Sequence, residues 1–344
     1  MTVLVAAGGT GGHTYPALAL AVELRDLGFA VRWVGRPDSP ESLLAAENGF
    51  DFEPLAAAGF FGKGPGAKAR ALVLAAAGFV RAMALLRRVK PDAVVATGGF
   101  ASAALLAAAV TLGTGYFLLE QNCVPGRVTR FFARGARESF LGFPSAAEFP
   151  GPSRVTGNPL RRTVTERLER VDDGRTVLVL GGSGGARALS LAGLDAAAAL
   201  ANLNFVVLAG RRDFESIRAL VHSRNCEVVE YTARPEELYR RATIAVSRAG
   251  GMVLSELVAF GIPAVLVPFP YATDRHQDAN AACLESAGCA ITLDQARLSG
   301  LTAAINSLMD DTSARRSMES AARAFSQPSA GRAIAERIRE CLAG

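Results

Sequence analysis

The chain has 344 residues, of which 50% are hydrophobic and 20% charged; this composition excludes a disordered protein, and the length suffices for two folded domains. Its 37 Lys and Arg against 32 Asp and Glu suit an acidic ligand or an anionic membrane surface, whereas nucleic acid is not expected as a partner because no basic run is interleaved with aromatic residues. The five cysteines form no CxxC pair and the three histidines do not cluster near them, which indicates a reduced cytosolic setting without a zinc site. Residues 1–7 carry no basic side chain, so no signal peptide is expected.

The chain opens on a short apolar run over residues 3–7 and a helical pattern over 17–27, joined by a glycine-rich turn. The turn reads Gly8, Gly9, Thr10, Gly11, Gly12, His13. A strand, glycines and a helix start are typical of a turn whose backbone amides approach an anion. The spacing is not GxGxxG, and the next expected strand, 30–34, lacks the following acid that holds a ribose in nicotinamide enzymes. We therefore expect a ligand other than NAD, the alternative being a tight turn without a ligand.

A glycine-rich loop over residues 59–66 precedes a predicted helix over 71–86. The apolar residues of this helix recur at helical spacing, and cations surround them. The apolar set is Leu72, Ala76, Phe79, Val80, Met83 and Leu86, with Arg87 and Arg88 among the cations. This pattern favours an interface with an anionic membrane, the alternative being an ordinary buried helix with solvated ends.

Residues 93–119 carry no charge and are numerous enough to span a bilayer. Glycines at 98–99 and 113–115 cut this stretch into a strand (93–97), a helix (101–112) and a strand (116–119), which predicts a buried strand-helix-strand unit. Gly98, Gly99 and Phe100 follow the first strand, and residues 120–122 follow the second. Open α/β sheets bind ligands at this edge. Glu120 and Asn122 are therefore site residues or loop caps.

The strand and helix order repeats. An offset of 173 residues lays the turn 8–12 on Gly181, Gly182, Ser183, Gly184 and Gly185. This duplication predicts an α/β protein of two Rossmann-like, doubly wound parallel-sheet domains that face each other across a cleft, with a proline-punctuated linker near 143–159. The alternative is chance similarity of two glycine turns.

In the second half, residues 248–256 follow a predicted strand (244–247) and open a helix. Amides at this helix start can neutralise a diphosphate, and Glu256 can accept hydrogen bonds from a ribose diol or merely complement the helix dipole. Gln277 and Asn280 are three residues apart, so they share a helix face and could hold sugar hydroxyls. The chain has no Asp-x-Asp, so helix amino termini and Arg161 would stabilise a leaving diphosphate.

Together these motifs resemble the MurG family of bacterial glycosyltransferases over nearly the whole chain. The matching segments are 8–13, 98–100, 120–122, 157–161, 181–186, 255–256, 276–277 and 280–281. The resemblance implies a GT-B fold and inverting transfer of N-acetylglucosamine from UDP-N-acetylglucosamine to lipid I, which gives lipid II for peptidoglycan. It implies no metal or other cofactor, a peripheral location on the cytoplasmic face of the cell membrane, and other cell-wall synthesis proteins as further partners.

The resemblance also implies roles for the domains and for single residues. Residues 1–158, joined by a carboxyl-terminal helix over 331–344, would bind the acceptor and the membrane, and residues 159–330 would bind the donor. The donor residues would be Thr10, Gly11, Gly12, Asn122, Arg161, Ser183, Thr232, Gly251, Met252, Val253, Leu254, Ser255, Glu256, Gln277 and Asn280. The acceptor residues would be Gly8, Gly9, His13, Gly98, Gly99 and Phe100. The membrane residues would be Phe79, Val80, Met83, Arg87 and Arg88, and the catalytic residues His13, Glu120 and Asn122.

The chain departs from the family pattern at several positions. Leu119 stands where histidine is usual, Phe100 where tyrosine is common, Gly184 where glutamine is frequent, and residues 251–253 replace an Ala-Leu-Thr run. His13 or Glu120 would be the general base, and His13 is favoured because histidine titrates near neutrality. The rival functions are another GT-B enzyme, namely a diacylglycerol glycosyltransferase or a UDP-N-acetylglucosamine 2-epimerase, and an inactive nucleotide-sugar-binding homologue.

Overall fold

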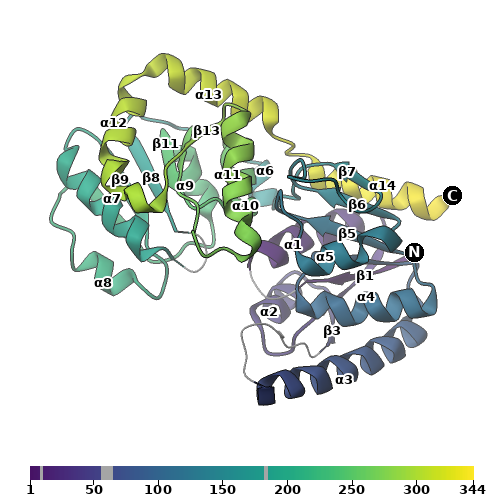
Figure 1. Ribbon diagram of the computed structural model, residues 1–344. Helices are drawn as coiled ribbons and strands as arrows, with labels where there is room; N and C mark the ends of the chain where they lie inside the picture. The colour runs from purple at the N-terminus through teal and green to yellow at the C-terminus, as the bar shows by residue number, and fades with distance from the viewer. Residues whose placement is uncertain (8–10, 56–64, 182–184) are drawn as a thin grey trace. The chain divides into compact units, whose positions relative to one another are not determined.

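The computed structural model describes residues 1–7, 11–55, 65–181 and 185–344, except for the side chains of 65–72, 100 and 101. Gly8, Gly9, Thr10 and Ser183 therefore lie outside the described residues, as does the side chain of Phe100. The chain divides into two compact units (Figure 1). Unit 1 comprises Met1–Arg161 and Ser329–Gly344, and unit 2 comprises Arg162–Pro328.

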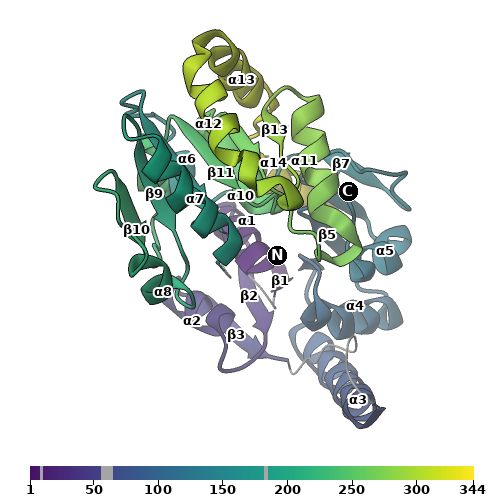
Figure 2. The ribbon, with the colours of Figure 1, turned by 60° about the vertical axis from the view of Figure 1, so that its left-hand side comes forward.

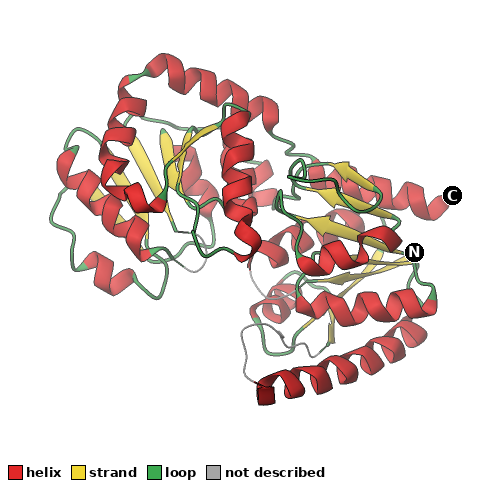
Figure 3. Cartoon of the chain, in the orientation of Figure 1, coloured by secondary structure: helices red, strands yellow, loops and turns green. Residues whose placement is uncertain are grey.

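Unit 1 is a parallel sheet with the strand order β3-β2-β1-β4-β5-β6-β7. Its strands are β1 (Thr2–Ala6), β2 (Ala30–Gly35), β3 (Asp51–Pro54), β4 (Ala93–Ala96), β5 (Tyr116–Glu120), β6 (Glu138–Leu141) and β7 (Ser153–Val155). The helices around it are α1 (Gly11–Asp26), α2 (Pro40–Glu47), α3 (Pro65–Val89), α4 (Phe100–Leu112), α5 (Arg127–Phe132), the short η1 (Ala133–Gly135) and α14 (Ala330–Ala343) (Figure 3).

Unit 2 is a second parallel sheet, ordered β10-β9-β8-β11-β12-β13. Figure 2 labels four of these strands, β9, β10, β11 and β13. Its strands are β8 (Thr176–Leu180), β9 (Asn204–Leu208), β10 (Cys226–Val229), β11 (Ile244–Ser247), β12 (Ala264–Leu266) and β13 (Ala290–Thr292). Its helices are α6 (Arg162–Thr165), α7 (Arg187–Ala199), α8 (Phe214–Arg218), α9 (Pro235–Arg241), α10 (Gly251–Phe260), η2 (Thr273–Arg275), α11 (His276–Ser286), η3 (Gln295–Gly300), α12 (Leu301–Asp310) and α13 (Thr312–Phe325).

The two sheets repeat one topology, which confirms the predicted fold class. In each, the strand order reverses beside the first strand, between β1 and β4 in unit 1 and between β8 and β11 in unit 2. Such reversals place the crevice for a ligand at the carboxyl ends of the strands. The repeat is not uniform, because α1 begins at Gly11 whereas α7 begins at Arg187, two residues later relative to the end of the preceding strand.

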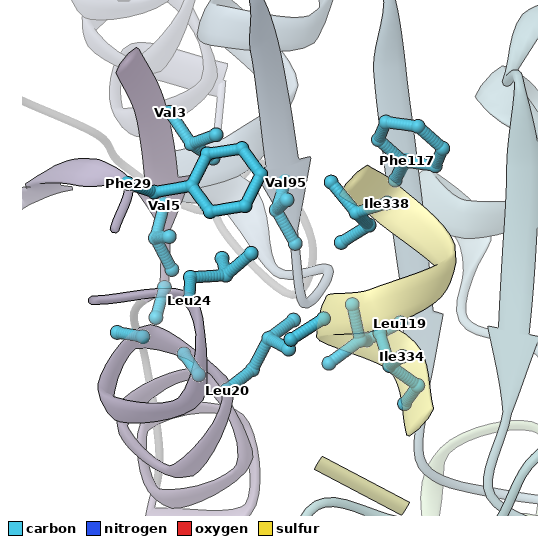
Figure 4. Close-up of a cluster of buried hydrophobic side chains, with 14 of the residues drawn as sticks. Val3, Val5, Leu20, Leu24, Phe29, Val95, Phe117, Leu119, Ile334 and Ile338 are labelled. Atoms are coloured by element: carbon cyan, nitrogen blue, oxygen red, sulfur yellow. The ribbon is translucent and has the colours of Figure 1, made fainter. Parts of the chain in front are cut away.

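The core of unit 1 explains why its strands are almost wholly apolar. Successive side chains of β1 point to opposite faces of the sheet, and helices cover both faces. On one face, Val3 and Val5 pack with Leu20 and Leu24 of α1 (Figure 4). α14 adds Ile334 and Ile338 to the same cluster, and neither side chain is accessible to solvent. α14 is therefore part of the core of unit 1, although it follows unit 2 in the sequence. Burial of each isoleucine side chain contributes about 1.5–3 kcal/mol to stability.

The uncharged stretch 93–119 forms β4, α4 and β5, as predicted. Gly113 ends α4 in a left-handed conformation, with φ 69°, and its backbone N–H donates to the carbonyls of Ala109 and Val110. Within the described part of the chain, no helix combines the length and apolar character needed to cross a membrane.

The boundary between the units falls between Arg161 and Arg162, three residues after the 158/159 boundary that the family resemblance implied. The segment before it is anchored in unit 1. Asn158 is buried and its Nδ2 donates to the carbonyl of Gln121 at 3.1 Å, while the guanidinium of Arg161 lies 4.7 Å from the ring centroid of Tyr15. These contacts keep residues 158–161 with the first unit, although Pro159 suggested a linker.

A buried carboxylate ties α14 to the edge of the sheet. Glu138 of β6 accepts hydrogen bonds from Nε of Arg154 on β7 at 3.0 Å and from Nε of Arg337 on α14 at 2.7 Å. Burial alone raises the pKa of Glu138, but the hydrogen bonds and positive charges of the two arginines outweigh it, so the pKa lies below its usual value. The ionised carboxylate therefore stabilises the folded state.

We expect Glu138→Gln to lower the free energy of unfolding by about 1 kcal/mol at neutral pH, because both arginines are partly exposed and water screens their charges. Since the folded-state pKa is depressed, this stabilisation is present above the unfolded-state pKa of about 4.3 and is lost as the pH falls through the folded-state value. Urea unfolding at neutral and acidic pH measures both effects. As a control, Glu336→Gln removes an exposed pair with Arg332 on the same helix and should cost less than about 0.5 kcal/mol. Equal effects of the two variants would contradict the expectation.

Candidate active site

The loops at the carboxyl ends of the strands of the unit 1 sheet bring together residues that are far apart in the sequence. α1 begins at Gly11, earlier than expected, so His13 lies in its first turn. Gly98, after β4, has φ 86°, a conformation that favours glycine. A Cβ atom at Gly98 would lie 3.7 Å from Cε1 of His13 and 3.4 Å from Oγ1 of Thr129. The imidazole therefore packs against the backbone of the β4–α4 turn.

His13 is joined to the loop after β5 by a side-chain hydrogen bond. Its Nδ1 lies 2.8 Å from Oε1 of Gln121, and Nε2 of Gln121 donates to the carbonyl of Leu119 at 3.1 Å. Gln121 is only 3% exposed. Gln121 had no predicted role of its own, and its one signal in the sequence was its position directly after the buried strand β5.

Glu120 organises its own loop. It is buried, and its Oε1 accepts hydrogen bonds from the backbone N–H of Asn122 at 3.1 Å and from Nδ2 of Asn122 at 3.3 Å. Its Oε2 accepts from the backbone N–H of Gly126 at 2.9 Å, directly before α5. Both carboxylate oxygens thus hold the 120–126 loop, which is the arrangement of a loop cap.

Leu119 occupies the position where the family pattern has histidine. Its side chain is 2% exposed and belongs to the same hydrophobic cluster as Leu20 and Ile334 (Figure 4). Position 119 therefore contributes to the core of unit 1, and in this chain the imidazole at the sheet edge is that of His13.

In unit 2, α10 begins just after the carboxyl end of β11. Glu256 is buried in this helix, and its Oε2 accepts a hydrogen bond from the Tyr239 hydroxyl at 2.7 Å. Ser255 is also buried and donates to the carbonyl of Gly251 at 3.0 Å, while Leu254 has no accessible surface and is a core residue. Met252 and Val253 are half-buried.

Arg248, just before this helix, is buried and was not singled out from the sequence. It donates to the carbonyls of Val267 and Pro268 and to Oε1 of Gln295, at 3.0, 3.3 and 2.6 Å. Burial lowers its pKa from the usual value. The arginine therefore ties together the loops that follow β11, β12 and β13.

Gln277 and Asn280 connect α11 to neighbouring loops. Oε1 of Gln277 accepts from the backbone N–H of Phe269 at 2.9 Å, and Nδ2 of Asn280 donates to the carbonyl of Ala249 at 2.9 Å. Asn280 has no accessible surface. Thr232 is half-buried, and its hydroxyl accepts from the backbone N–H of Arg234 at 3.0 Å. Among the described residues, no group of three or more His, Cys, Asp or Glu side chains is placed to hold a metal ion.

The expected membrane residues divide between two sides of α3. Phe79 and Met83 are partly buried and pack against the core, whereas Val80 is 65% exposed and Arg87 is exposed. Nη2 of Arg88 bonds Oε2 of Glu53 at 2.6 Å. The wider apolar stripe of the helix faces α4 and the sheet, because burial there removes the most apolar surface from water.

Two parallel-sheet units of matching strand order, with glycine turns and polar side chains at the carboxyl edges, define the GT-B class of glycosyltransferases. Residues 3–140 match the glycosyltransferase family 28 N-terminal domain, and residues 176–336 match the family 28 C-terminal domain.

Relatives match over almost the whole chain. A UDP-N-acetylglucosamine–N-acetylmuramyl-(pentapeptide) pyrophosphoryl-undecaprenol N-acetylglucosamine transferase of Methylococcus capsulatus is 37% identical over 97% of each chain, and that of Geobacter sulfurreducens is 34% identical over 98% of each. The crystal structure of MurG from Acinetobacter baumannii superposes with a TM-score of 0.78 at 28% identity, covering 98% of this chain and 99% of that one. The chain therefore belongs to the MurG family of N-acetylglucosamine transferases within glycosyltransferase family 28.

We expect Glu120→Gln to loosen the 120–126 loop, because an amide cannot accept hydrogen bonds at both ends and its NH₂ group would face a backbone N–H. The cost should be about 1–3 kcal/mol. Thermal unfolding measures the loss, and hydrogen exchange at the backbone amides of Asn122 and Gly126 localises it. Glu47→Gln, at an exposed position of α2, is the control. Unchanged exchange at both amides would show that Glu120 does not hold the loop.

Proposed function

We propose that this chain transfers N-acetylglucosamine from UDP-N-acetylglucosamine to the undecaprenyl-diphosphate-linked muramyl pentapeptide, lipid I, and so forms lipid II for peptidoglycan synthesis. Membership of the MurG family over both units supports the reaction. The observation at the site that carries the proposal is the His13 imidazole, bonded to Gln121 at the edge where open α/β sheets bind ligands.

In the proposed reaction, the muramyl hydroxyl attacks the anomeric carbon of the donor sugar as UDP leaves, with inversion and through an oxocarbenium-like state. His13 takes the proton of the hydroxyl as general base. Glu120 is the weaker candidate, since both of its carboxylate oxygens already accept hydrogen bonds from Asn122 and Gly126. Its proposed contribution is to position Asn122.

Unit 2 would hold the donor. Glu256 would accept hydrogen bonds from the ribose hydroxyls, and the Tyr239 hydroxyl, bonded to Oε2, orients that carboxylate. The amides at the start of α10, together with Ser183 and Arg161, would stabilise the diphosphate without a metal. Gln277 would contact the sugar and the backbone of Thr232 the uracil. Asn280 would act indirectly, because it is buried and holds the carbonyl of Ala249 ahead of α10.

Unit 1 would hold the acceptor. Gly8, Gly9 and His13 would bind the acceptor diphosphate region together with Gly98, Gly99 and Phe100, and Thr10, Gly11, Gly12 and Asn122 would complete the donor site. An assay with labelled UDP-N-acetylglucosamine and a lipid I analogue, with and without chelator, tests the donor, the acceptor and metal independence together. Conversion of UDP-N-acetylglucosamine to its 2-epimer without lipid product would instead indicate an epimerase. Binding of UDP without formation of any product would indicate an inactive homologue.

We expect His13→Ala to lower kcat by about 10²–10⁴-fold, the usual contribution of a general base, while the affinity for UDP stays within about twofold. Steady-state kinetics with the lipid I analogue and calorimetric titration with UDP measure the two quantities. His222→Ala removes an exposed histidine from unit 2 and should leave both unchanged. A loss of less than about tenfold in kcat would contradict the role of His13 as base.

We also propose that unit 1 binds the cytoplasmic surface of an anionic membrane. Exposed apolar side chains occur on α3 (Val73 and Val80), α4 (Val110) and α5 (Phe131), and α3 packs beside α4, which contacts α5 (Figure 1). Arg81 and Arg87 are exposed on α3. Apolar side chains beside cations suit an interface with anionic lipids.

Val80→Glu should weaken binding to anionic vesicles at least severalfold, because the carboxylate adds repulsion and removes apolar contact, and Arg81→Gln with Arg87→Gln should reduce the salt sensitivity of binding. Co-sedimentation with vesicles measures both. Val171→Glu is a matched control, since Val171 lies in unit 2 and is 66% exposed, against 65% for Val80. Equal binding of the two valine variants would exclude this surface.

A further inference from the structure

The amide group of Gln121 has a chemically defined orientation. One end lies 2.8 Å from Nδ1 of His13, and the other lies 3.1 Å from the carbonyl oxygen of Leu119. A backbone carbonyl can only accept a hydrogen bond, so the NH₂ end of the amide must face Leu119. The oxygen end must then face His13.

This orientation determines which imidazole nitrogen carries the proton. An amide oxygen only accepts hydrogen bonds, so Nδ1 of His13 must donate, and in a neutral imidazole the proton on Nδ1 leaves the lone pair on Nε2. We propose that Gln121 is a positioning residue that holds neutral His13 as the Nδ1–H tautomer and thereby makes Nε2 the proton acceptor.

The surroundings hold the pair in place. Gln121 is 3% exposed, its backbone carbonyl accepts a hydrogen bond from Nδ2 of the buried Asn158 at 3.1 Å, and Leu119 before it is part of the core. On the other side, the backbone of Gly98 lies against the His13 ring. Rotation of the amide would set its oxygen against the carbonyl oxygen of Leu119, so that hydrogen bond would be lost whichever tautomer His13 adopted.

The tautomer matters because of the proposed function, on which this step rests. Nε2 takes the proton of the muramyl hydroxyl, the hydroxyl oxygen forms the bond to the anomeric carbon, and the bond from that carbon to the UDP oxygen breaks with its electron pair on the diphosphate. Nδ1–H stays bonded to Gln121 throughout. Because the amide is neutral, it fixes the tautomer without placing a negative charge beside an anionic acceptor, as a carboxylate would.

Nitrogen-15 NMR of the full-length chain tests the tautomer without any assay of activity. The chain has three histidines, His13, His222 and His276, so the imidazole signals of His13 are identified by their disappearance in His13→Gln. At about pH 8, where histidine is normally neutral, we expect the shifts and long-range couplings of a protonated Nδ1 and an unprotonated Nε2. A protonated Nε2 in the wild-type protein would overturn the proposal even if transferase activity is found. The expected spectrum without transferase activity would overturn the proposed function alone.

Two variants separate positioning from packing. Gln121→Met keeps the length of the side chain but cannot accept from Nδ1–H, so we expect population of the Nε2–H tautomer and a fall of about 10–100-fold in kcat, with KM for UDP-N-acetylglucosamine little changed. Gln121→Glu retains an acceptor, so it should restore the Nδ1–H tautomer and a higher kcat than Gln121→Met. A methionine variant that keeps either the wild-type tautomer or the wild-type kcat would overturn the proposal.

A control variant accounts for lost stability. Asn225 of unit 2 donates through Nδ2 to the carbonyls of Ala197, Leu200 and Leu203, before the amino end of β10. Asn225→Leu removes these bonds and should lower the melting temperature while leaving the His13 tautomer and kcat unchanged. If Gln121→Met fails to fold, the wild-type and Gln121→Glu spectra still decide, since both should show the Nδ1–H tautomer.

Discussion

A parallel sheet must bury both of its faces, and this requirement shapes unit 1. The strands of its centre are apolar on both sides, so each face needs its own layer of helices. On one face, α1 leaves room beside Leu20 and Leu24 that α14 fills with Ile334 and Ile338. Glu138 adds a polar link, because it receives hydrogen bonds from both Arg154 and Arg337. Polar side chains gather instead at the carboxyl ends of the strands, and the candidate site residues lie there.

At these strand ends, one chain of hydrogen bonds connects the site to the core. It runs from His13 to Gln121, from Gln121 to the carbonyl of Leu119, and from Asn158 back to the carbonyl of Gln121. Leu119 is a core residue, so the position of the imidazole depends on packing inside the sheet as well as on the loop. Glu120 has a parallel structural role, because it holds the loop that carries Asn122.

The fold followed from the sequence because its signals are local. Glycines at 98–99 and 113–115 divided the uncharged stretch into elements that the structure contains, and the repeated strand-glycine-helix pattern predicted two sheets of one topology. Side-chain direction was harder to predict. Phe79 and Val80 fit the same helical pattern, yet Phe79 packs inward and Val80 faces solvent. Which side of α3 is buried depends on where α4 packs against it, and α4 lies outside the pattern that predicts the helix. The pairing of His13 with Gln121 joins residues 108 positions apart, so no local pattern could reveal it.

The place of α14 in the core of unit 1 has a consequence for synthesis of the protein. A ribosome makes residues 1–161 first, then the whole of unit 2, and only then the helix that covers Leu20, Leu24 and Leu119. Throughout that interval, the nascent first unit presents an uncovered apolar face, the kind of surface that promotes aggregation or recruits chaperones. Unit 2 is contiguous in the sequence, so it can complete its core before α14 is made. The two units therefore complete their cores in the opposite order to that in which their synthesis starts.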